Sequence, residues 1–334
     1  MRTISLTFLG FLITCSAIWS VLAFFYAGPS NLFLQGGVIV SYSGFAVFAF
    51  FSIVQKRQIW RSCLIYIGLL ILMLAWYFSL KPSNERQWQT DVAISSKVFI
   101  KDNLITVNDV RNFDYRSATN YFPAYYDKVY DLNKLKGADI IVVYWMGPLI
   151  AHTFVSFDFG QEGQLAISIE ARKELGEKFS MIKGFFRQYE LYYVVADERD
   201  VIRLRTNYRH NPNEDVFIYR ISATISNIRA VFMQYMNEVN SLNKVPKFYN
   251  SLTTNCTTEI WKASQVNKPQ IPFSWKILAS GYLPEYLYEQ NLLETRGLTF
   301  EALKQSAYVN KKAQQLPNTS DFSTKVRELN TLAK

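Results

Sequence analysis

The sequence contains few residues that can act as nucleophiles or metal ligands. Its 334 residues include three cysteines and only two histidines, His152 and His210. No cysteines and histidines have the spacing of a zinc site, and neither a glycine-rich phosphate loop nor a Gly-x-Ser-x-Gly motif is present. The sequence therefore predicts no bound metal and no cofactor. Chemistry that needs an imidazole must use one of the two histidines.

Charged residues are absent from residues 3–55. Two apolar stretches fill this region, residues 4–26 and 32–54, and a third covers residues 62–80. Each has about 20 residues, the length that crosses a bilayer core as a helix. A cleaved signal peptide is a competing interpretation of the first stretch, but the spans that follow favour a multispan anchor.

The domain limits and the orientation follow from these stretches. We predict a membrane anchor with three transmembrane helices over residues 1–81 and a catalytic domain over residues 82–334. Arg2 and the loop that contains Lys56 and Arg57 carry positive charge, which predicts that both lie in the cytoplasm. The second domain is then periplasmic, anchored in the inner membrane of a bacterium with two membranes. The net charge of +9 favours anionic partners. With the anchor present, we expect the membrane and no nucleic acid.

The pattern of the second domain predicts an α+β fold, with an antiparallel sheet packed on helices. A β-branched run and alternating apolar residues predict strands, which cover residues 98–107, 138–145, 151–159, 165–170, 189–196, 201–205 and 215–221. Apolar residues at helical spacing and breaker residues predict helices, at residues 125–135, 224–240, 256–265, 274–293 and 300–311. The polar tail after residue 316 is expected to be loose.

Cys256 is the cysteine that lies outside the apolar stretches. Cys15 and Cys63 lie in predicted spans, so Cys256 has no expected disulfide partner. It stands where a loop enters a predicted helix, and the positive end of a helix lowers the pKa of a thiol. We therefore expect Cys256 to be a catalytic nucleophile. The alternative is a small buried residue without chemistry.

A hairpin places the candidate base beside candidate orienting residues. The turn at residues 160–163 joins two predicted strands, and one register sets Phe157 opposite Leu165. In that register His152 lies opposite Glu170, and Ser168 is on the same face one pair along, with neighbours about 5 Å apart. A slip by one residue would reverse the face.

These residues make a candidate triad of Cys256, His152 and Glu170, with Ser168 as the rival third member. A thiol nucleophile needs a base within hydrogen-bond reach and a group that orients the base. A strand-end histidine bonded to backbone is the alternative interpretation of His152. His210 lies in a polar loop and is predicted to be solvated.

Four charged residues are candidates for contact with substrate. Arg172 and Arg116 could bind a phosphate or a carboxylate, and Arg199 and Glu198 could brace the site. The alternative for each arginine is a surface ion pair that contributes little. The run at residues 197–200 is expected to be a solvated turn.

The order of the candidate residues, histidine first and cysteine last, resembles the circularly permuted branch of the papain-like NlpC/P60 superfamily. The Asn255-Cys256 pair is similar to the Asn-Cys of permuted acyltransferases such as lecithin:retinol acyltransferase, which adds Asn255 to the predicted substrate-binding residues. Several ordered segments resemble the Lnb N-terminal periplasmic domain family, namely residues 110–116, 151–154, 168–172, 196–200, 252–257 and 271–288.

The resemblance implies a permuted papain-like lipoprotein N-acyltransferase. A phospholipid would donate an acyl chain to Cys256 as a thioester, and the acceptor would be the α-amine of a diacylated lipoprotein's N-terminal cysteine. His152 would deprotonate the thiol and later accept the amine proton, and the Cys256 N–H would face the oxyanion. In the name-giving member the membrane part follows the domain, whereas here three spans precede it.

Two other functions are also compatible with the sequence. A periplasmic cysteine peptidase or amidase acting on peptidoglycan peptides would use the same thiol chemistry. A membrane-tethered binding module would keep the fold without the chemistry. An apolar groove beside Cys256 would favour acyl transfer, and an open polar cleft would favour the hydrolase.

Overall fold

The computed structural model of the protein describes residues 2–328. Met1 and residues 329–334, which the predicted domain limits include, lie outside this description. The side chain of Arg2, used for the predicted orientation, also lies outside it. The chain divides into two compact units, and each is described by itself.

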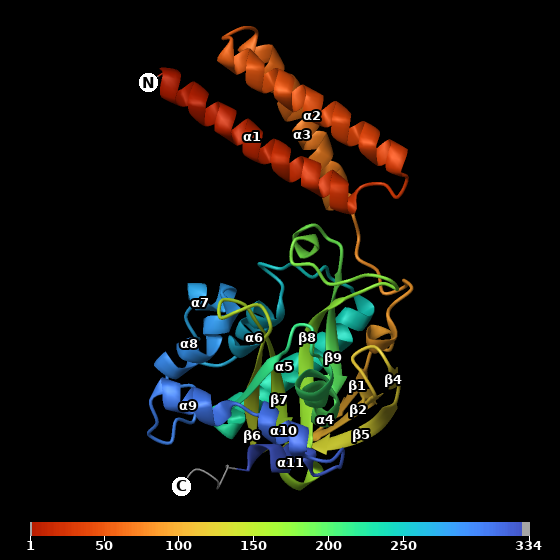
Figure 1. Cartoon of the computed structure of the whole chain (residues 1–334), viewed down its shortest axis with the longest axis vertical. Coiled ribbons are helices and arrows are strands. Elements are labelled where there is room, and N and C mark those ends of the chain that lie inside the picture. Colours follow the sequence, from red (N-terminus) through yellow and green to blue (C-terminus); the bar gives the residue numbers. More distant parts are fainter. Residues whose placement is uncertain (1, 329–334) are drawn as a thin grey trace. The chain divides into compact units, whose positions relative to one another are not determined.

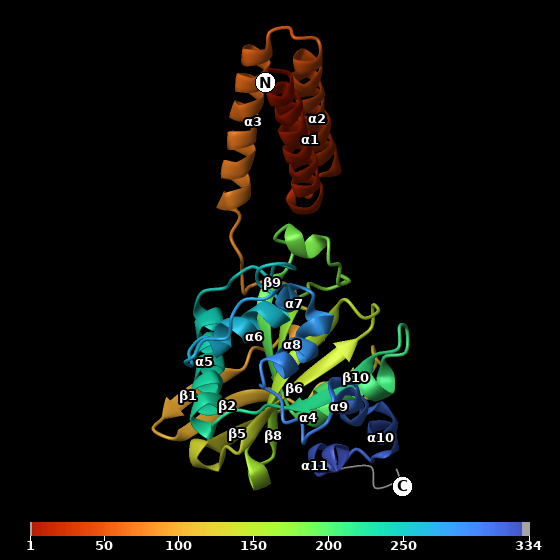
Figure 2. The ribbon, with the colours of Figure 1, turned by 90° about the vertical axis from the view of Figure 1, so that its left-hand side faces the viewer.

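The first unit comprises Met1–Ser83 together with Phe179–Tyr189. Its helices are α1 (Arg2–Ala27), α2 (Leu32–Val54) and α3 (Ile59–Ser79), drawn in red and orange in Figures 1 and 2. All three are long and apolar enough to cross a membrane, which confirms the predicted spans.

Polar side chains inside the bundle bond across helices. The Ser16 hydroxyl lies 2.8 Å from the Tyr66 hydroxyl, and the Tyr42 hydroxyl donates to Ser20 Oγ at 3.1 Å. Such bonds satisfy polar groups where no water is present and hold spanning helices together. The three helices therefore pack as a bundle.

The second unit comprises Asn84–Lys178 and Glu190–Lys334. Its sheet has eight strands in the order β1-β2-β9-β8-β7-β6-β10, and β5 also pairs with β2. The strands are β1 (Lys97–Lys101), β2 (Leu104–Arg111), β5 (Tyr125–Asp131), β6 (Gly137–Tyr144), β7 (Ala151–Asp158), β8 (Gln164–Arg172), β9 (Glu190–Ala196) and β10 (Asp215–Arg220). Neighbours run antiparallel except β2 and β9, so the sheet is mixed. A separate hairpin joins β3 (Asp114–Tyr115) to β4 (Tyr121–Phe122).

Helices cover both faces of this sheet. They are α4 (Glu198–Arg203), α5 (Ile225–Lys244), α6 (Cys256–Ser264), α7 (Trp275–Leu278), α8 (Leu283–Glu289), α9 (Phe300–Ala307), α10 (Asn310–Gln315) and α11 (Phe322–Arg327). On one face, the Phe157 ring packs against Phe232 of α5 with ring centroids 5.0 Å apart. On the other face, Phe154 shares a buried cluster with Val201 of α4 and Phe322 of α11. The predicted α+β class is confirmed, with a mixed rather than a wholly antiparallel sheet.

Two predicted elements are wrong, and the helices expected over residues 274–293 and 300–311 are each divided in two, into α7 and α8 and into α9 and α10. Residues 125–135 were expected to be a helix, but Tyr125–Asp131 is strand β5, paired with β2. Its three tyrosines and its valine have high strand propensity, and pairing with β2 outweighs local helix preference. Residues 201–205 were expected to be a strand, but they belong to α4 and to the π-helical turn Leu204–Tyr208. Asp197 caps this helix, because its side chain accepts a hydrogen bond from the Arg199 N–H.

Residues 317–328 of the polar tail pack into the second unit, so the expectation of a loose tail is wrong for this part of it. Phe322 and Val326 of α11 are buried, and Arg327 forms ion pairs with both Glu198 and Asp139. The burial of Phe322 and Val326 and the ion pairs of Arg327 with buried carboxylates hold this polar segment in place.

Candidate functional site

Cys256 is the first residue of α6, and a capping box holds the helix start. The Asn255 side chain accepts hydrogen bonds from the backbone N–H groups of Thr257 and Thr258, and the Thr258 hydroxyl accepts one from the Asn255 N–H. Asn255 also donates to the Ser251 carbonyl at 2.8 Å. Cys256 therefore stands at the positively polarised end of a well-capped helix.

His152 is the second residue of β7, and its hairpin has the predicted register. The β7–β8 ladder pairs Phe157 with Leu165 and extends to Ser168, which confirms that register. The ladder stops before His152 and Glu170, so these residues are not a backbone pair. Their side chains nevertheless meet.

A 3₁₀ turn fixes the backbone next to His152. Ser280 Oγ accepts a hydrogen bond from the Ala151 N–H at 2.9 Å and donates one to the Ala151 carbonyl at 2.7 Å. The following residue must be small, because a Cβ on Gly281 would lie 2.0 Å from the Pro148 carbonyl oxygen. Ser280 thus holds the strand start that presents His152, a role that the sequence did not reveal.

The imidazole, a hydroxyl and a carboxylate form a short relay. His152 Nε2 lies 2.8 Å from Ser168 Oγ and 3.1 Å from Glu170 Oε1. The Ser168 hydroxyl donates to Glu170 Oε1 at 2.7 Å, and Arg205 Nη2 donates to the same oxygen at 3.0 Å. Both predicted orienting residues, Glu170 and Ser168, therefore contact the imidazole.

The thiol and the imidazole shift each other's pKa. Burial opposes protonation of His152, but the Glu170 carboxylate and a hydrogen bond with Cys256 outweigh it and raise the pKa of His152 to about 9. Burial raises the pKa of the Cys256 thiol, but the hydrogen bond and charge of His152 outweigh it and lower that pKa to about 7. Both shifts favour a thiolate beside an imidazolium.

Two buried threonines complete the surroundings of the sulfur. The Thr257 hydroxyl lies 3.7 Å from Cys256 Sγ and 3.4 Å from the Thr153 hydroxyl. Backbone and side-chain hydrogen bonds from Thr153 also lower the pKa of Cys256. Thr153 follows the candidate base directly in sequence, so one strand supplies both the imidazole and the polar groups that favour the thiolate.

Arg205 is a member of the relay that the sequence did not identify. The sequence predicts a strand that ends at Arg205. In the structure, Arg205 lies in the π-helical turn Leu204–Tyr208, which brings its guanidinium to Glu170. Its Nε lies 3.9 Å from Glu214 Oε2, and neither atom has a hydrogen-bond partner among residues 2–328. The available signal in the sequence was Glu170 itself, a carboxylate within a predicted strand. A carboxylate that becomes partly buried there needs a cation as its partner.

The other predicted contacts lie elsewhere in the unit. Arg172 is buried between the rings of Trp88 and Tyr192 and donates to the carbonyls of Val92 and Ala93. These bonds occupy its guanidinium in the core.

Arg116 and Arg199 are also committed to local contacts. Arg116 is exposed over the Phe122 ring of the β3–β4 hairpin, 4.5 Å from its centroid. Arg199 bonds Asn112 Oδ1. Of the five predicted binding residues, Asn255 alone contacts the first turn of α6, where it acts as the helix cap.

The run at residues 197–200 was expected to be a solvated turn, and this expectation is wrong. Glu198 is buried and pairs with Arg327, and Asp200 is buried against Arg111. Asp200 accepts four hydrogen bonds, two from Arg111 and one each from the Phe113 N–H and the Tyr115 hydroxyl. These side chains brace the fold rather than the thiol.

Two cavities flank α6. One cavity, of about 230 Å³, is mostly apolar, and its lining includes Ile260, which lies one helical turn from Cys256. The other, of about 300 Å³, is polar and is lined by residues such as Tyr193, Glu238 and Glu259. An apolar space and a polar space therefore lie along the same helix that carries the thiol.

Among residues 2–328, no group of three His, Cys, Asp or Glu side chains is placed to hold a metal ion.

Residues 121–281 match the family model described as the Lnb N-terminal periplasmic domain. No curated protein matches the chain, and no solved structure does. The matched region contains Cys256, His152 and Glu170, and the three apolar helices precede it. The chain is thus a membrane protein with a periplasmic domain.

Proposed function

Since residues 121–281 carry an Lnb N-terminal periplasmic domain, we propose that the protein is a membrane-anchored thiol acyltransferase of the lipoprotein N-acyltransferase kind. It takes an acyl chain from a phospholipid and passes it to the α-amine of a lipoprotein's N-terminal cysteine. The observation that carries the proposal is the relay in which His152 contacts Ser168 and Glu170, together with the influence of His152 that lowers the pKa of the Cys256 thiol.

In the first half-reaction the Cys256 thiolate attacks the carbonyl carbon of the phospholipid ester. The backbone N–H of Cys256 is one of the helix-start N–H groups that have no partner within the helix, so it can donate to the developing oxyanion. The ester C–O bond breaks, and the His152 imidazolium gives its proton to the leaving glycerol oxygen. A thioester, a lysophospholipid and a neutral imidazole result.

In the second half-reaction the free amine of the acceptor attacks the thioester. The neutral imidazole of His152 takes the amine proton as the C–N bond forms. The C–S bond breaks and the thiolate is restored beside an imidazolium. Glu170 keeps its negative charge throughout, because the pKa of Glu170 is held well below its usual range against burial by His152 and Arg205.

Two features favour a lipid donor over a peptide substrate. The apolar cavity beside α6 is lined by Ile260 and Trp261 of that helix and by Val155 of β7, which suits a hydrocarbon chain. The three-helix anchor keeps the domain at a membrane, where both proposed substrates reside. We further propose that the second unit is a permuted papain-like domain, and that it faces the periplasm from the inner membrane.

Mass spectrometry of lipoprotein N-termini tests the proposal. Cells without the gene should accumulate lipoproteins with a free α-amine, and the wild-type chain should restore the acylated form. The Cys256→Ser variant should fail to restore it. Cys15→Ser is the matched control, because it makes the same exchange at an exposed cysteine of α1, and it should restore acylation fully.

The outcomes separate the alternatives. An unchanged lipoprotein profile without the gene contradicts the acceptor and favours a hydrolase of peptidoglycan peptides. Full restoration by Cys256→Ser contradicts the nucleophile itself.

A further inference from the structure

The segment Phe179–Tyr189 lies between strands β8 and β9 in sequence but groups with the membrane helices in space. It contains one 3₁₀ turn, Lys183–Phe185, and is otherwise irregular. The length of the segment does not predict a membrane role, because it is far too short to span a bilayer.

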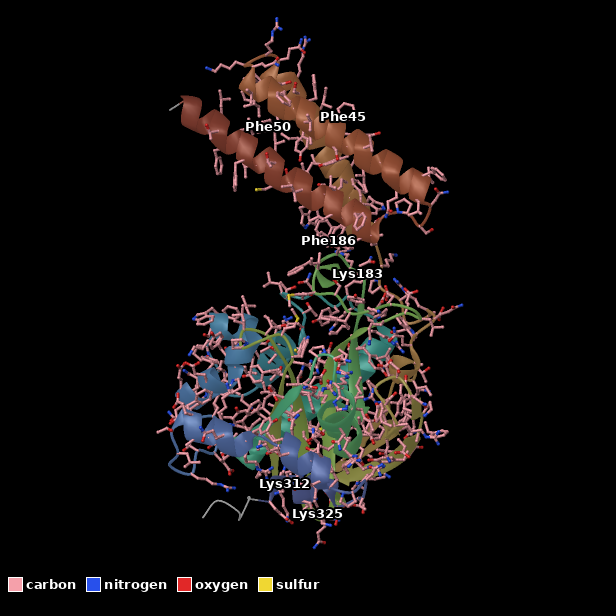
Figure 3. All side chains as sticks on the ribbon, viewed as in Figure 1. Phe45, Phe50, Lys183, Phe186, Lys312 and Lys325 are labelled. Atoms are coloured by element: carbon pink, nitrogen blue, oxygen red, sulfur yellow. The ribbon has the colours of Figure 1, made fainter. Side chains whose placement is uncertain are left out.

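Side chains of this segment pack into the anchor. The Phe186 ring is buried against α1, where its centroid lies 5.3 Å from that of Tyr26 and 6.4 Å from that of Trp19. The Tyr77 hydroxyl of α3 donates to the Phe185 carbonyl at 3.3 Å. Figure 3 shows Phe186 and Lys183 beside the ends of these helices.

Arg187 closes the end of α3. Its Nη1 donates to the carbonyls of Tyr77 and Leu80 at 2.9 and 3.1 Å, and its guanidinium lies over the rings of Tyr77 and Phe78. The last carbonyls of a helix have no partner within it, and in a membrane each unsatisfied one is costly. The segment therefore completes α3 at its exit from the predicted span.

These contacts lie near the ends of the candidate membrane spans. Tyr26 is one residue from the end of α1, and Tyr77 is two residues from the end of α3. With Trp19 and Trp76 they form a group of tyrosines and tryptophans of the kind that marks a bilayer interface.

Apolar side chains of the segment remain exposed. Phe179, Ile182 and Phe185 are 44%, 53% and 38% exposed, whereas Phe186 next to them is buried in the bundle. Because the Phe186 ring packs on α1 and the Phe185 carbonyl accepts a hydrogen bond from α3, a bilayer that surrounds these helices would lie next to the exposed side chains. Lys183, between two of them, can reach lipid phosphates from the same position.

We propose that Phe179–Tyr189 is a lipid-facing interfacial segment, which inserts Phe179, Ile182 and Phe185 into the headgroup and upper acyl region of the outer leaflet. An interfacial segment of this kind buries its apolar side to about 5–10 Å. The proposal does not depend on acyl transfer.

The test uses the full chain in vesicles of phosphatidylcholine and phosphatidylglycerol. The three native cysteines are replaced by serine, and an environment-sensitive fluorophore is attached at Ile182→Cys. Leu72→Cys, on the exposed side of α3, is the membrane reference, and Val129→Cys, exposed on β5, is the aqueous reference. The quencher is a phospholipid with a nitroxide near the top of its acyl chain.

We expect the fluorophore at position 182 to show a blue shift and a loss of intensity with the nitroxide lipid, as at position 72. The fluorophore at position 129 should show neither. Emission at position 182 that matches position 129, while position 72 is quenched, would overturn the proposal. Quenching at position 72 shows that the cysteine-free background inserts, and a version of the Ile182→Cys variant that also carries Leu72→Cys shows in the same preparation that the labelled chain is inserted.

Discussion

Two buried charge clusters of the second unit differ in how completely they are closed. In the cluster of Asp200 and Arg111, the carboxylate accepts four hydrogen bonds and no part of it is exposed. In the cluster of Glu170, His152 and Arg205, the Glu170 side chain is 30% exposed and the imidazole also faces the thiol.

The difference distinguishes an ion pair whose carboxylate is fully enclosed from one whose carboxylate is still partly exposed. The residues of the second cluster and Asp200 of the first lie within the matched residues 121–281, whereas Arg111 lies before them. In the first, closed cluster every hydrogen-bonding site of the carboxylate has a partner, so the cluster is suited to holding the fold. In the second, open cluster the carboxylate is partly exposed, so it can still exchange hydrogen-bond partners.

The largest effect is expected at the base. His152→Ala should lower kcat/KM for acyl transfer by roughly 10²- to 10⁴-fold, the usual contribution of a positioned acid–base group. The measurement follows amide formation on a diacylglyceryl-cysteine peptide with the protein in phospholipid vesicles. His210→Ala is the matched control, because His210 is exposed. Equal loss in both variants would remove the distinction between the two histidines.

The closed cluster should respond in stability instead. Asp200→Ala leaves the Arg111 guanidinium buried without its partner, which should lower the free energy of unfolding by about 3–5 kcal/mol. Urea unfolding of the purified chain in detergent measures it. Asp114→Ala, at an exposed position of β3, should change it by less than about 0.5 kcal/mol. A stable Asp200→Ala protein without activity would instead place Asp200 in the chemistry.

The open cluster should respond in its pH dependence. Activity should rise as Cys256 ionises near pH 7 and fall as His152 loses its proton near pH 9. In Glu170→Gln the carboxylate no longer favours the imidazolium, so the pKa of His152 falls and the pKa of Cys256 rises. Both limbs of the profile therefore move inward and the active range narrows.

The pH–rate profile of kcat/KM measures this change, with about a tenfold loss for each pKa unit of lost interaction. Glu162→Gln is the control, since its carboxylate pairs with Lys134 far along the hairpin. An unchanged profile in Glu170→Gln would mean that Glu170 does not orient the base.

The smallest effect is expected at the hydroxyl of the relay. Ser168→Ala removes one hydrogen bond to His152 and one to Glu170, but the direct contact of those two residues remains. We expect a few-fold lower kcat/KM, equivalent to about 0.5–1.5 kcal/mol. Ser156→Ala is the control, because its buried hydroxyl has no partner among residues 2–328. A loss as large as that of His152→Ala would make Ser168 the third member of the triad.

Local signals were sufficient for the elements on which the site is built. Three uncharged runs predicted the spans, and the Gly160–Gly163 turn predicted the β7–β8 hairpin. The turn left a slip by one residue open, and the register of the structure is the one that pairs Phe157 with Leu165. Local signals failed at residues 125–135 and 201–205, where pairing with β2 and packing of α4 decided the outcome.

Arg205 and Ser280 show why part of the site was not predictable. Arg205 lies 35 residues from Glu170, and Ser280 lies 129 residues from Ala151. Contacts at such separations depend on which face of the sheet a helix covers, and no local pattern encodes that choice. The same holds for Phe186, which lies in a loop by sequence and packs into the membrane bundle in the structure.

By itself, the sequence determined the three spans, the start of the Cys256 helix and the strand that carries His152, because hydrophobic periodicity and capping act over a few residues. Tertiary structure decided which charges close upon themselves and which remain open to the thiol. It also brought Phe179–Tyr189 to the anchor. Burial and ion pairing between distant segments set these outcomes, since the free energy of a buried charge depends on partners that only the folded chain supplies.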